Sequence, residues 1–419
     1  MKVYFTPCGI ALGHAGRCLP IAKEIIKKKG KILFSTYGDA VDFLRTENVP
    51  TVKVPEIKFE ENKDGAVDLK RTATKVTKHA HTFLRQITTE IKLLKTFNPD
   101  IVVSDSRLSP LIACRLLGKP SILLLHQLKM LIPHRRTLSK LEQKLKHFGE
   151  FIIMYTLYPW WSLANIILIP DFPPPYTIAK ENLKIPKKIL ENKAKLIGPI
   201  ISKRPEELPP SQELKAKLGF NKNKPLIYAG MGGTKKEKYL INTILERVFK
   251  KFPDNYQIVF TRGYPNKPEI AYKKENLHVY NWFKDRYILL KACDIIISRA
   301  GHNTVAEAIY FGKPLILVPT PAHSEHQGNA KSAQKMGIAK VIQQENLNLK
   351  TLLEAIEEIM NNGYILRNVR RAQQFALKIN AIKTVLQYIK LFTAKDFRRE
   401  DNLVKCYNSS ITGMLNLFV

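Results

Sequence analysis

The sequence has 419 residues, of which 45% are hydrophobic and 25% charged, and this composition excludes a disordered or fibrous protein. A chain of this length exceeds what one hydrophobic core usually supports, so we expect two domains. The formal net charge of +32 is spread evenly, with 33 Lys and Arg against 17 Asp and Glu in residues 1–200 and 35 against 19 in the remainder. Such an excess is typical of a protein that meets an anionic membrane, nucleotide phosphates or nucleic acid, and the alternative is a compositional bias.

The cysteines and the N-terminus indicate the compartment. The five cysteines are odd in number and far apart, and they lack the paired spacing of a zinc site or a disulfide framework. The first apolar run meets Pro7 and Gly9 at once, so it is too short for the core of a signal peptide. We therefore expect reduced cysteines, a cytoplasmic location and no metal site.

The first half of the chain alternates between apolar runs and helical segments. An apolar run at 3–6, a glycine-rich loop at 8–16 and an amphipathic helix at 18–29 precede a second apolar run at 31–35. This order predicts a β-α-β unit, in which a right-handed crossover joins two parallel strands. Short β-branched runs bounded by turn residues predict further buried strands at 101–104, 121–125 and 166–169.

One segment reaches the nominal length of a membrane span, because residues 151–170 contain no charged side chain. Pro159, the Trp160-Trp161 pair and the β-branched run at 166–169 favour an aromatic helix end followed by a core strand. Two alternatives remain, namely a helix face that lies on a membrane and a true span.

A proline-rich stretch at 201–212 predicts the linker between an N-terminal acceptor domain, 1–200, and a C-terminal donor domain, 213–392. The tail at 393–419 has no pattern that can be interpreted. In the second domain we expect a helix at 239–251, a helical end at 349–392, and strands at 226–229, 258–261, 294–297 and 314–318. The predicted fold class is α/β, with two doubly wound, Rossmann-like domains facing a central cleft.

Candidate catalytic residues lie in the loops after the strands, because doubly wound sheets bind ligands at the carboxyl ends of their strands. His14 follows the first run, where an imidazole can take a proton from a hydroxyl near neutral pH. Asp105 ends the run at 101–104 and would orient that imidazole. Each residue also has a simpler interpretation. His14 belongs to a common type of glycine-rich turn, and Asp105 with Ser106 matches a helix cap.

Two loops of the second domain have the features of a phosphate site. Residues 230–234, Gly-Met-Gly-Gly-Thr, lead from a strand into a helix and would offer free backbone N–H groups to phosphate oxygens. At 298–307 a strand again leads directly into a helix. There Gly301 and Thr304 suit a pyrophosphate, Arg299 adds positive charge, and Glu307 would accept hydrogen bonds from ribose hydroxyls.

Residues 298–330 resemble the donor-binding region of GT-B glycosyltransferases. The resemblance is to the group that contains the peptidoglycan UDP-N-acetylglucosamine transferase, in family 28, and the UDP-glycosyltransferases, with the archaeal members closest in style. Residues 13–17, Gly-His-Ala-Gly-Arg, resemble the Gly-His loop of the same superfamily. The resemblance implies an inverting, UDP-sugar-dependent hexosyltransferase without metal or other cofactor, with His14 as general base and Asp105 as its partner.

The resemblance also implies the parts of a donor site. The diphosphate, ribose and sugar hydroxyls would be held by residues at 232–234, 299–307 and 325–327, and the base would be received by the turn at 280–283. The donor-site residues are Gly232, Gly233, Thr234, Phe283, Arg299, Gly301, His302, Asn303, Thr304, Glu307, Glu325, His326 and Gln327. Arg299 stands where the plant and animal enzymes carry a histidine, and their Asp-Gln pair appears as Glu325-His326. These two departures leave the donor sugar open.

Basic residues in two segments, Lys70 to Arg85 and Arg135-Arg136, favour a lipid-carried acceptor at an anionic membrane, which the chain would meet as a peripheral protein. A merely solvated lysine-rich helix is the alternative. Two other functions remain open. A nucleotide-sugar 2-epimerase shares the fold but needs additional catalytic carboxylates, and a nucleic-acid-binding protein would need a basic aromatic module. Neither feature is evident, and no nucleic-acid partner is expected.

Overall fold

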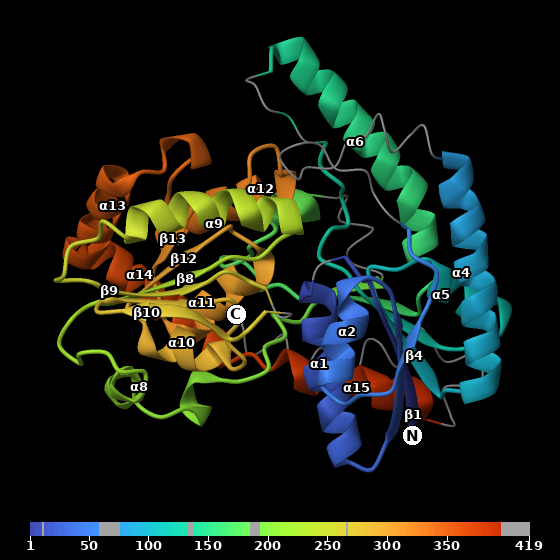
Figure 1. Ribbon diagram of the computed structural model, residues 1–419. Helices are drawn as coiled ribbons and strands as arrows, with labels where there is room; N and C mark the ends of the chain where they lie inside the picture. The colour runs from blue at the N-terminus through green and yellow to red at the C-terminus, as the bar shows by residue number, and fades with distance from the viewer. Residues whose placement is uncertain are drawn as a thin grey trace.

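The computed structural model describes residues 1–10, 12–57, 76–132, 134, 138–184, 193–264 and 267–394. Two seven-stranded sheets, one from each half of the chain, lie beside each other and carry helices on their faces (Figure 1). The Lys70-Arg71, Lys75 and Arg135-Arg136 parts of the basic segments lie outside the described residues, as does the tail beyond residue 394.

The first sheet has the strand order β3-β2-β1-β4-β5-β6-β7, and every neighbouring pair is parallel. Successive residues of a strand point to opposite faces, so Val3 and Phe5 join one core with α1 and α15, whereas Tyr4 packs with α4 and α5. The elements are β1 (Lys2–Pro7), α1 (Gly13–Lys27), β2 (Lys31–Thr36), α2 (Asp39–Thr46), β3 (Thr51–Lys53), α4 (Val76–Phe97), β4 (Ile101–Asp105), α5 (Ser109–Leu116), β5 (Ser121–Leu124), α6 (Lys140–Trp161), β6 (Ile166–Ile169), η1 (Lys180–Leu183) and β7 (Ala194–Leu196).

The second sheet has the order β10-β11-β9-β8-β12-β13-β14, with β10 and β11 antiparallel and the other pairs parallel. One large apolar cluster forms its core. The elements are η2 (Pro205–Glu207), α8 (Ser211–Lys217), β8 (Leu226–Gly230), α9 (Lys235–Phe249), β9 (Gln257–Thr261), β10 (Ile270–Lys274), β11 (Leu277–Tyr280), α10 (Arg286–Ala292), β12 (Ile295–Ser298), α11 (His302–Phe311), β13 (Leu315–Leu317), α12 (Ser324–Lys335), β14 (Ala339–Val341), η3 (Gln344–Asn346), α13 (Leu349–Asn361), α14 (Gly363–Leu377) and α15 (Ala381–Thr393).

All the strands expected from the sequence are present, and the α/β fold class is confirmed. The additional strands β3, β7, β10 and β14 lie at the sheet edges, and β11 lies next to an edge. Edge strands are short and partly exposed, so they carry little of the continuous apolar signal that marks a central strand. The first helix begins at Gly13 instead of residue 18, which places His14 in its first turn.

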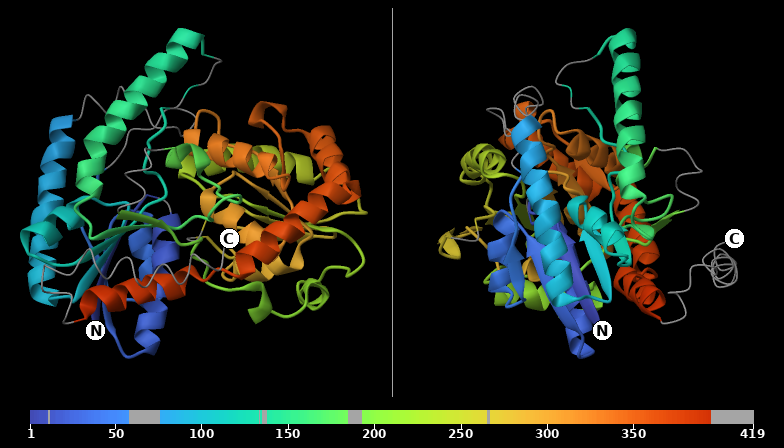
Figure 2. Two further views of the ribbon diagram at one scale, coloured as in Figure 1. Left: turned by 180° about the vertical axis from the view of Figure 1, so that it is seen from behind. Right: turned by 90° about the vertical axis from the view of Figure 1, so that its right-hand side faces the viewer.

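The last helix, α15, packs against the first sheet, whereas residues 213–392 were all expected to belong to the second domain. Its inward side chains Val385, Ile389 and Phe392 belong to the same buried cluster as Val3 and Phe5. The chain therefore returns to its N-terminal half after completing the second sheet (Figure 2). Sequence periodicity shows that a helix has an apolar face but not which sheet covers that face.

The uncharged segment at 151–170 forms the end of α6 and the buried strand β6, as the helix-and-strand interpretation predicts. Among the described residues, no helix combines the length and the apolar character that a membrane crossing needs.

Candidate active site

A histidine and an aspartate meet where the strand order of the first sheet reverses. The neighbours β1 and β4 end together, with Pro7 opposite Asp105, and α1 starts a few residues later. His14 Nδ1 lies 2.7 Å from Asp105 Oδ1. Arg17 Nη2 lies 3.0 Å from the same nitrogen. In the tautomer that carries its proton on Nδ1, His14 donates to the carboxylate, which only accepts, and Nε2 keeps a lone pair. No described residue bonds His14 Nε2, and the side chain is partly exposed.

Arg17 holds the same aspartate as an ion. Its Nη2 donates to Asp105 Oδ1 at 2.5 Å, and its Nε donates to Oδ2. Burial opposes the charge of Asp105, but attraction to Arg17 and then to His14 outweighs burial and holds the pKa of this carboxyl well below its ordinary value. The helix-cap interpretation of Asp105 is wrong. The residue that precedes α5 is Leu108, and no side chain caps that helix.

The second sheet reverses its order between β8 and β12, and both predicted phosphate loops follow these two strands. Beside Gly232 and beside Gly301, space is open where a side chain would begin, so a ligand can approach the backbone there. Gly233 has a φ of +113° and Ala300 a φ of +61°, and the buried Asn329 donates to the Ala300 carbonyl at 3.0 Å. Alanine rarely adopts a positive φ, so the surrounding structure must hold Ala300 and its loop in this conformation.

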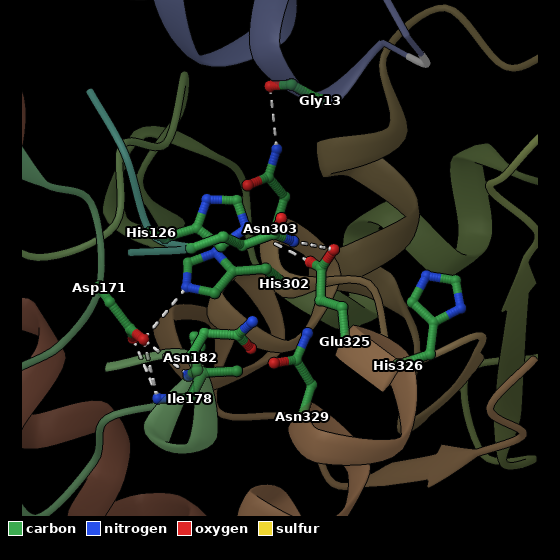
Figure 3. A network of polar contacts seen from close by, with 12 residues as sticks. Gly13, His126, Asp171, Ile178, Asn182, His302, Asn303, Glu325, His326 and Asn329 are labelled. Carbon is green, nitrogen blue, oxygen red and sulfur yellow. Dashed lines mark hydrogen bonds and ion pairs between the residues drawn. The ribbon is translucent and has the colours of Figure 1, made fainter. Parts of the chain in front are cut away.

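The start of α11 faces the start of α1. Asn303 Nδ2 donates to the Gly13 carbonyl at 3.2 Å, and Thr304 is partly exposed in the same turn. Gly301 occupies the N-cap position, where backbone N–H groups lack partners within the helix. The bond from Asn303 places the start of α11 against Gly13, the residue that precedes His14 in the chain (Figure 3).

His302 is buried between the halves. Its ring packs against that of His126, which follows β5, at a centroid distance of 4.7 Å and a tilt of 32°, and its Nε2 lies 3.4 Å from Asp171 Oδ2 (Figure 3). Asp171 also accepts backbone N–H groups from Phe172, Ile178 and Ala179. Both ring nitrogens of His302 are buried without a hydrogen-bond partner among the described residues, and its part in donor binding stays a prediction.

Glu325 reaches across from the second half to the first. Gln127 Nε2 donates to its Oε2 at 2.5 Å, and His126 Nε2 lies 3.3 Å from its Oε1. Burial lowers the pKa of His126 to about 4, so the ring is neutral and donates from Nε2 while Nδ1 accepts from Arg17 at 3.0 Å. Burial opposes the charge of Glu325 as well, but the hydrogen bond from His126 holds its pKa well below the ordinary value. One polar network therefore runs from His14 to Glu325.

Arg299, His326 and Gln327 surround Thr320. Arg299 Nε donates to Thr320 Oγ1 at 3.0 Å, His326 Nδ1 lies 2.9 Å from that oxygen, and Gln327 Nε2 donates to the Thr320 carbonyl at 3.5 Å. Burial lowers the pKa of Arg299 to about 10, against the opposing attraction of the Glu237 carboxylate. A positive group in this position favours an incoming anion.

The remaining predicted donor residues, Glu307, Thr234 and Phe283, each contact another residue of the protein. Glu307 accepts from Arg286 and Tyr287 through Oε1, its Oε2 is buried without a partner, and burial raises its pKa. Thr234 is the N-cap of α9, with its hydroxyl accepting from the Glu237 N–H. Phe283 packs edge-on against Tyr280 at a ring distance of 5.0 Å.

One group among the described residues has the composition of a metal site. Ligand atoms of Glu237, His323 and His326 lie within 4.8 Å of one another, and Glu237 Oε1 is buried without a partner. The cationic Arg299 shares Thr320 with His326, and its charge opposes a cation at this place. The sequence did not predict this group, because α9 and α12 are too far apart in the chain for a metal-ligand spacing to be recognised.

Four residues of the site were not predicted from the sequence, namely Arg17, His126, Gln127 and Asp171. Searching the residues directly after each strand would have found three of them, since His126 and Gln127 follow β5 and Asp171 follows β6. Arg17 belongs to the 13–17 motif but was given no role there, because an arginine on a helix is usually solvated.

Comparison with known proteins gives a consistent picture. Residues 231–385 match the glycosyltransferase family 28 C-terminal domain. An uncharacterized glycosyltransferase of Methanosarcina acetivorans is 27% identical over 93% of this chain and 98% of its own length. A second relative is the UDP-N-acetylglucosamine--N-acetylmuramyl-(pentapeptide) pyrophosphoryl-undecaprenol N-acetylglucosamine transferase 2 of Bacillus cereus, 31% identical over 41% of this chain and 49% of its own. The crystal structure of Acinetobacter baumannii MurG superposes with a TM-score of 0.58 at 19% identity, covering 93% of this chain and 99% of that one.

Proposed function

Because the chain is a GT-B glycosyltransferase of the family 28 type, we propose that it transfers a hexose-type sugar from a UDP-sugar to an acceptor hydroxyl with inversion at the anomeric carbon. The observation that carries the proposal is the 2.7 Å contact of His14 with Asp105, which is linked through Gly13 and Asn303 to the phosphate-type loop of the second sheet. A base and an anion site are thus brought to one place.

In this proposal His14 Nε2 accepts the proton of the acceptor hydroxyl. The acceptor oxygen forms a bond to the anomeric carbon while the bond from that carbon to the diphosphate breaks, and the electron pair leaves with the diphosphate. Asp105 keeps the imidazole in the required tautomer and stabilises the imidazolium that forms. An α-linked donor would give a β-glycoside.

The leaving diphosphate would be stabilised by backbone N–H groups. The Thr234 N–H already donates to Glu237 Oε2 at 2.8 Å, so the main donors would be the N–H groups at the start of α11, which lack partners within the helix and have open space beside Gly301. Such groups favour negative charge because their dipoles are already oriented. Arg299 adds positive charge behind them. Glu325, His326 and Gln327 would contact the donor sugar, and the bonds of Glu325 to His126 and Gln127 would make its position depend on closure of the two halves.

For the acceptor we propose a lipid-carried hydroxyl at the cytoplasmic surface of a membrane. The name of the Bacillus cereus relative includes an undecaprenol-linked acceptor, and the net charge of +32 favours an anionic surface. None of the relatives described above is an epimerase or a nucleic-acid-binding protein, so neither alternative gains support.

The proposal is tested first by calorimetric titration of the purified chain with UDP, GDP, ADP and TDP. We expect UDP to bind with micromolar affinity and the same affinity in EDTA, because backbone groups and Arg299 supply the anion site. Loss of affinity in EDTA would instead assign a metal to Glu237, His323 and His326. Absence of binding by every nucleotide would overturn the donor assignment.

Glu307→Gln should weaken UDP binding by roughly tenfold to a hundredfold, because a hydrogen bond to a charged acceptor is lost while the side-chain volume is kept. The proposed role is contact with the ribose hydroxyls, so the variant should also lose discrimination between UDP and 2′,3′-dideoxy-UDP. Glu246→Gln is the matched control, since Glu246 pairs with Arg262 in the same half. An equal loss for both nucleotides would contradict the ribose contact.

A further inference from the structure

Helix α6 exposes a continuous apolar stripe. Leu141, Leu145, Phe148, Ile152 and Tyr155 are between 48% and 68% exposed. Their spacing of four, three, four and three residues places them on one side of the helix, over about 20 Å of its length. Isolated exposed apolar residues are ordinary, but five large ones in a row on one helix face are not.

The stripe is not the packing face of the helix. The opposite face carries Glu150, Met154 and Trp161, which are buried. Glu150 accepts the backbone N–H of Ile132 at 3.0 Å and pairs with Lys129 at 2.9 Å, which fixes α6 to the loop that follows β5. Figure 2 shows the first part of α6 extending past the body of the N-terminal half. The exposed face is therefore held outward by a buried anchor.

Charges beside the stripe indicate what covers it. Lys140 and Lys144 are exposed along one flank, and the acidic residue of the first turn, Glu142, is engaged in the capping box with Ser139. An apolar stripe with aromatic members and a basic flank is the pattern of a helix that lies in the interface of an anionic membrane. Pairing with a second copy would bring these lysines toward each other in a parallel dimer and would leave the excess charge unbalanced.

We propose that the exposed face of α6 docks on an anionic lipid bilayer and lies in the plane of its interface. The loop that joins β5 to α6 also carries His126 and Gln127, so docking holds the network at the cleft close to the lipid surface. The benefit to a lipid-carried acceptor rests on the proposed function, whereas the docking itself does not.

The test is sedimentation of the full chain with vesicles of phosphatidylcholine alone or mixed with phosphatidylglycerol. The unmodified chain should bind the mixed vesicles at least about tenfold more tightly. The variant Leu145→Ser, Phe148→Ser, Ile152→Ser should lose about a hundredfold in vesicle affinity, because three apolar side chains no longer enter the interface. Lys140→Glu with Lys144→Glu should weaken binding to the mixed vesicles only.

The matched control replaces three exposed apolar residues elsewhere, Leu116, Ile270 and Met360, by serine and should bind vesicles like the unmodified chain. Equal vesicle binding by the stripe variant would overturn the proposal. So would a dimer in solution that the stripe variant converts to a monomer, since the occupant would then be a second copy. UDP titration of the stripe variant should be unchanged, which separates failure of the docking surface from failure of the donor site.

Discussion

Replacing His14 by alanine is expected to lower the rate of sugar transfer by about 10²- to 10⁴-fold, because the variant lacks the proposed general base for the acceptor hydroxyl. UDP affinity should stay within about twofold, since the proposed donor contacts come from the second sheet. The measurement pairs UDP release, in the presence of an acceptor that supports turnover by the unmodified chain, with calorimetric titration of UDP.

Three further variants test this role of His14. His81→Ala removes an exposed histidine on α4 and should leave the rate unchanged. Asp105→Asn should slow transfer, and the double variant with His14→Ala should be no slower than His14→Ala alone, because the aspartate acts through the imidazole. Full additivity of the two losses, or a His14→Ala enzyme with normal turnover, would remove His14 from the role of base.

Replacing Arg17 by methionine is expected to lower the free energy of unfolding by about 3–5 kcal/mol at neutral pH, because it leaves the buried Asp105 charge without its main partner. Lys23→Met, on the same helix, breaks the exposed pair with Glu47 and should cost at most about 1 kcal/mol. Urea unfolding of the three proteins measures both values.

The deficit of the Arg17→Met variant, meaning its loss in free energy of unfolding relative to the unmodified chain, should depend on pH. The folded-state pKa of Asp105 is depressed, so its stabilising contribution is present above the unfolded-state pKa of about 3.9 and is lost as the pH falls below it. The variant lacks most of this contribution, so its deficit should shrink in acid. A deficit that is the same at pH 7 and in acid would mean that Arg17 stabilises the protein by packing instead of by charge.

Much of the fold could be predicted because the signals are local. Central parallel strands are buried on both faces, so each appears as a short β-branched run, and every such run that we identified became a strand. The loops that follow these runs contained His14, Asp105 and the glycines at 232 and 301. The sequence did not predict the edge strands or the early start of α1, where burial is partial and capping is weak.

The sequence by itself determined the alternation of strands and helices, the loops that reach the cleft, and the motifs by which the chain resembles its family, because these depend on the spacing of neighbouring residues. Only the tertiary structure decided that Arg17 pairs with Asp105, that Glu325 bonds to His126 across the two halves, and that α15 returns to the first sheet. The physical reason is that burial selects these partners. A charge removed from water must find its counterpart wherever the packed chain brings one, at any distance along the sequence.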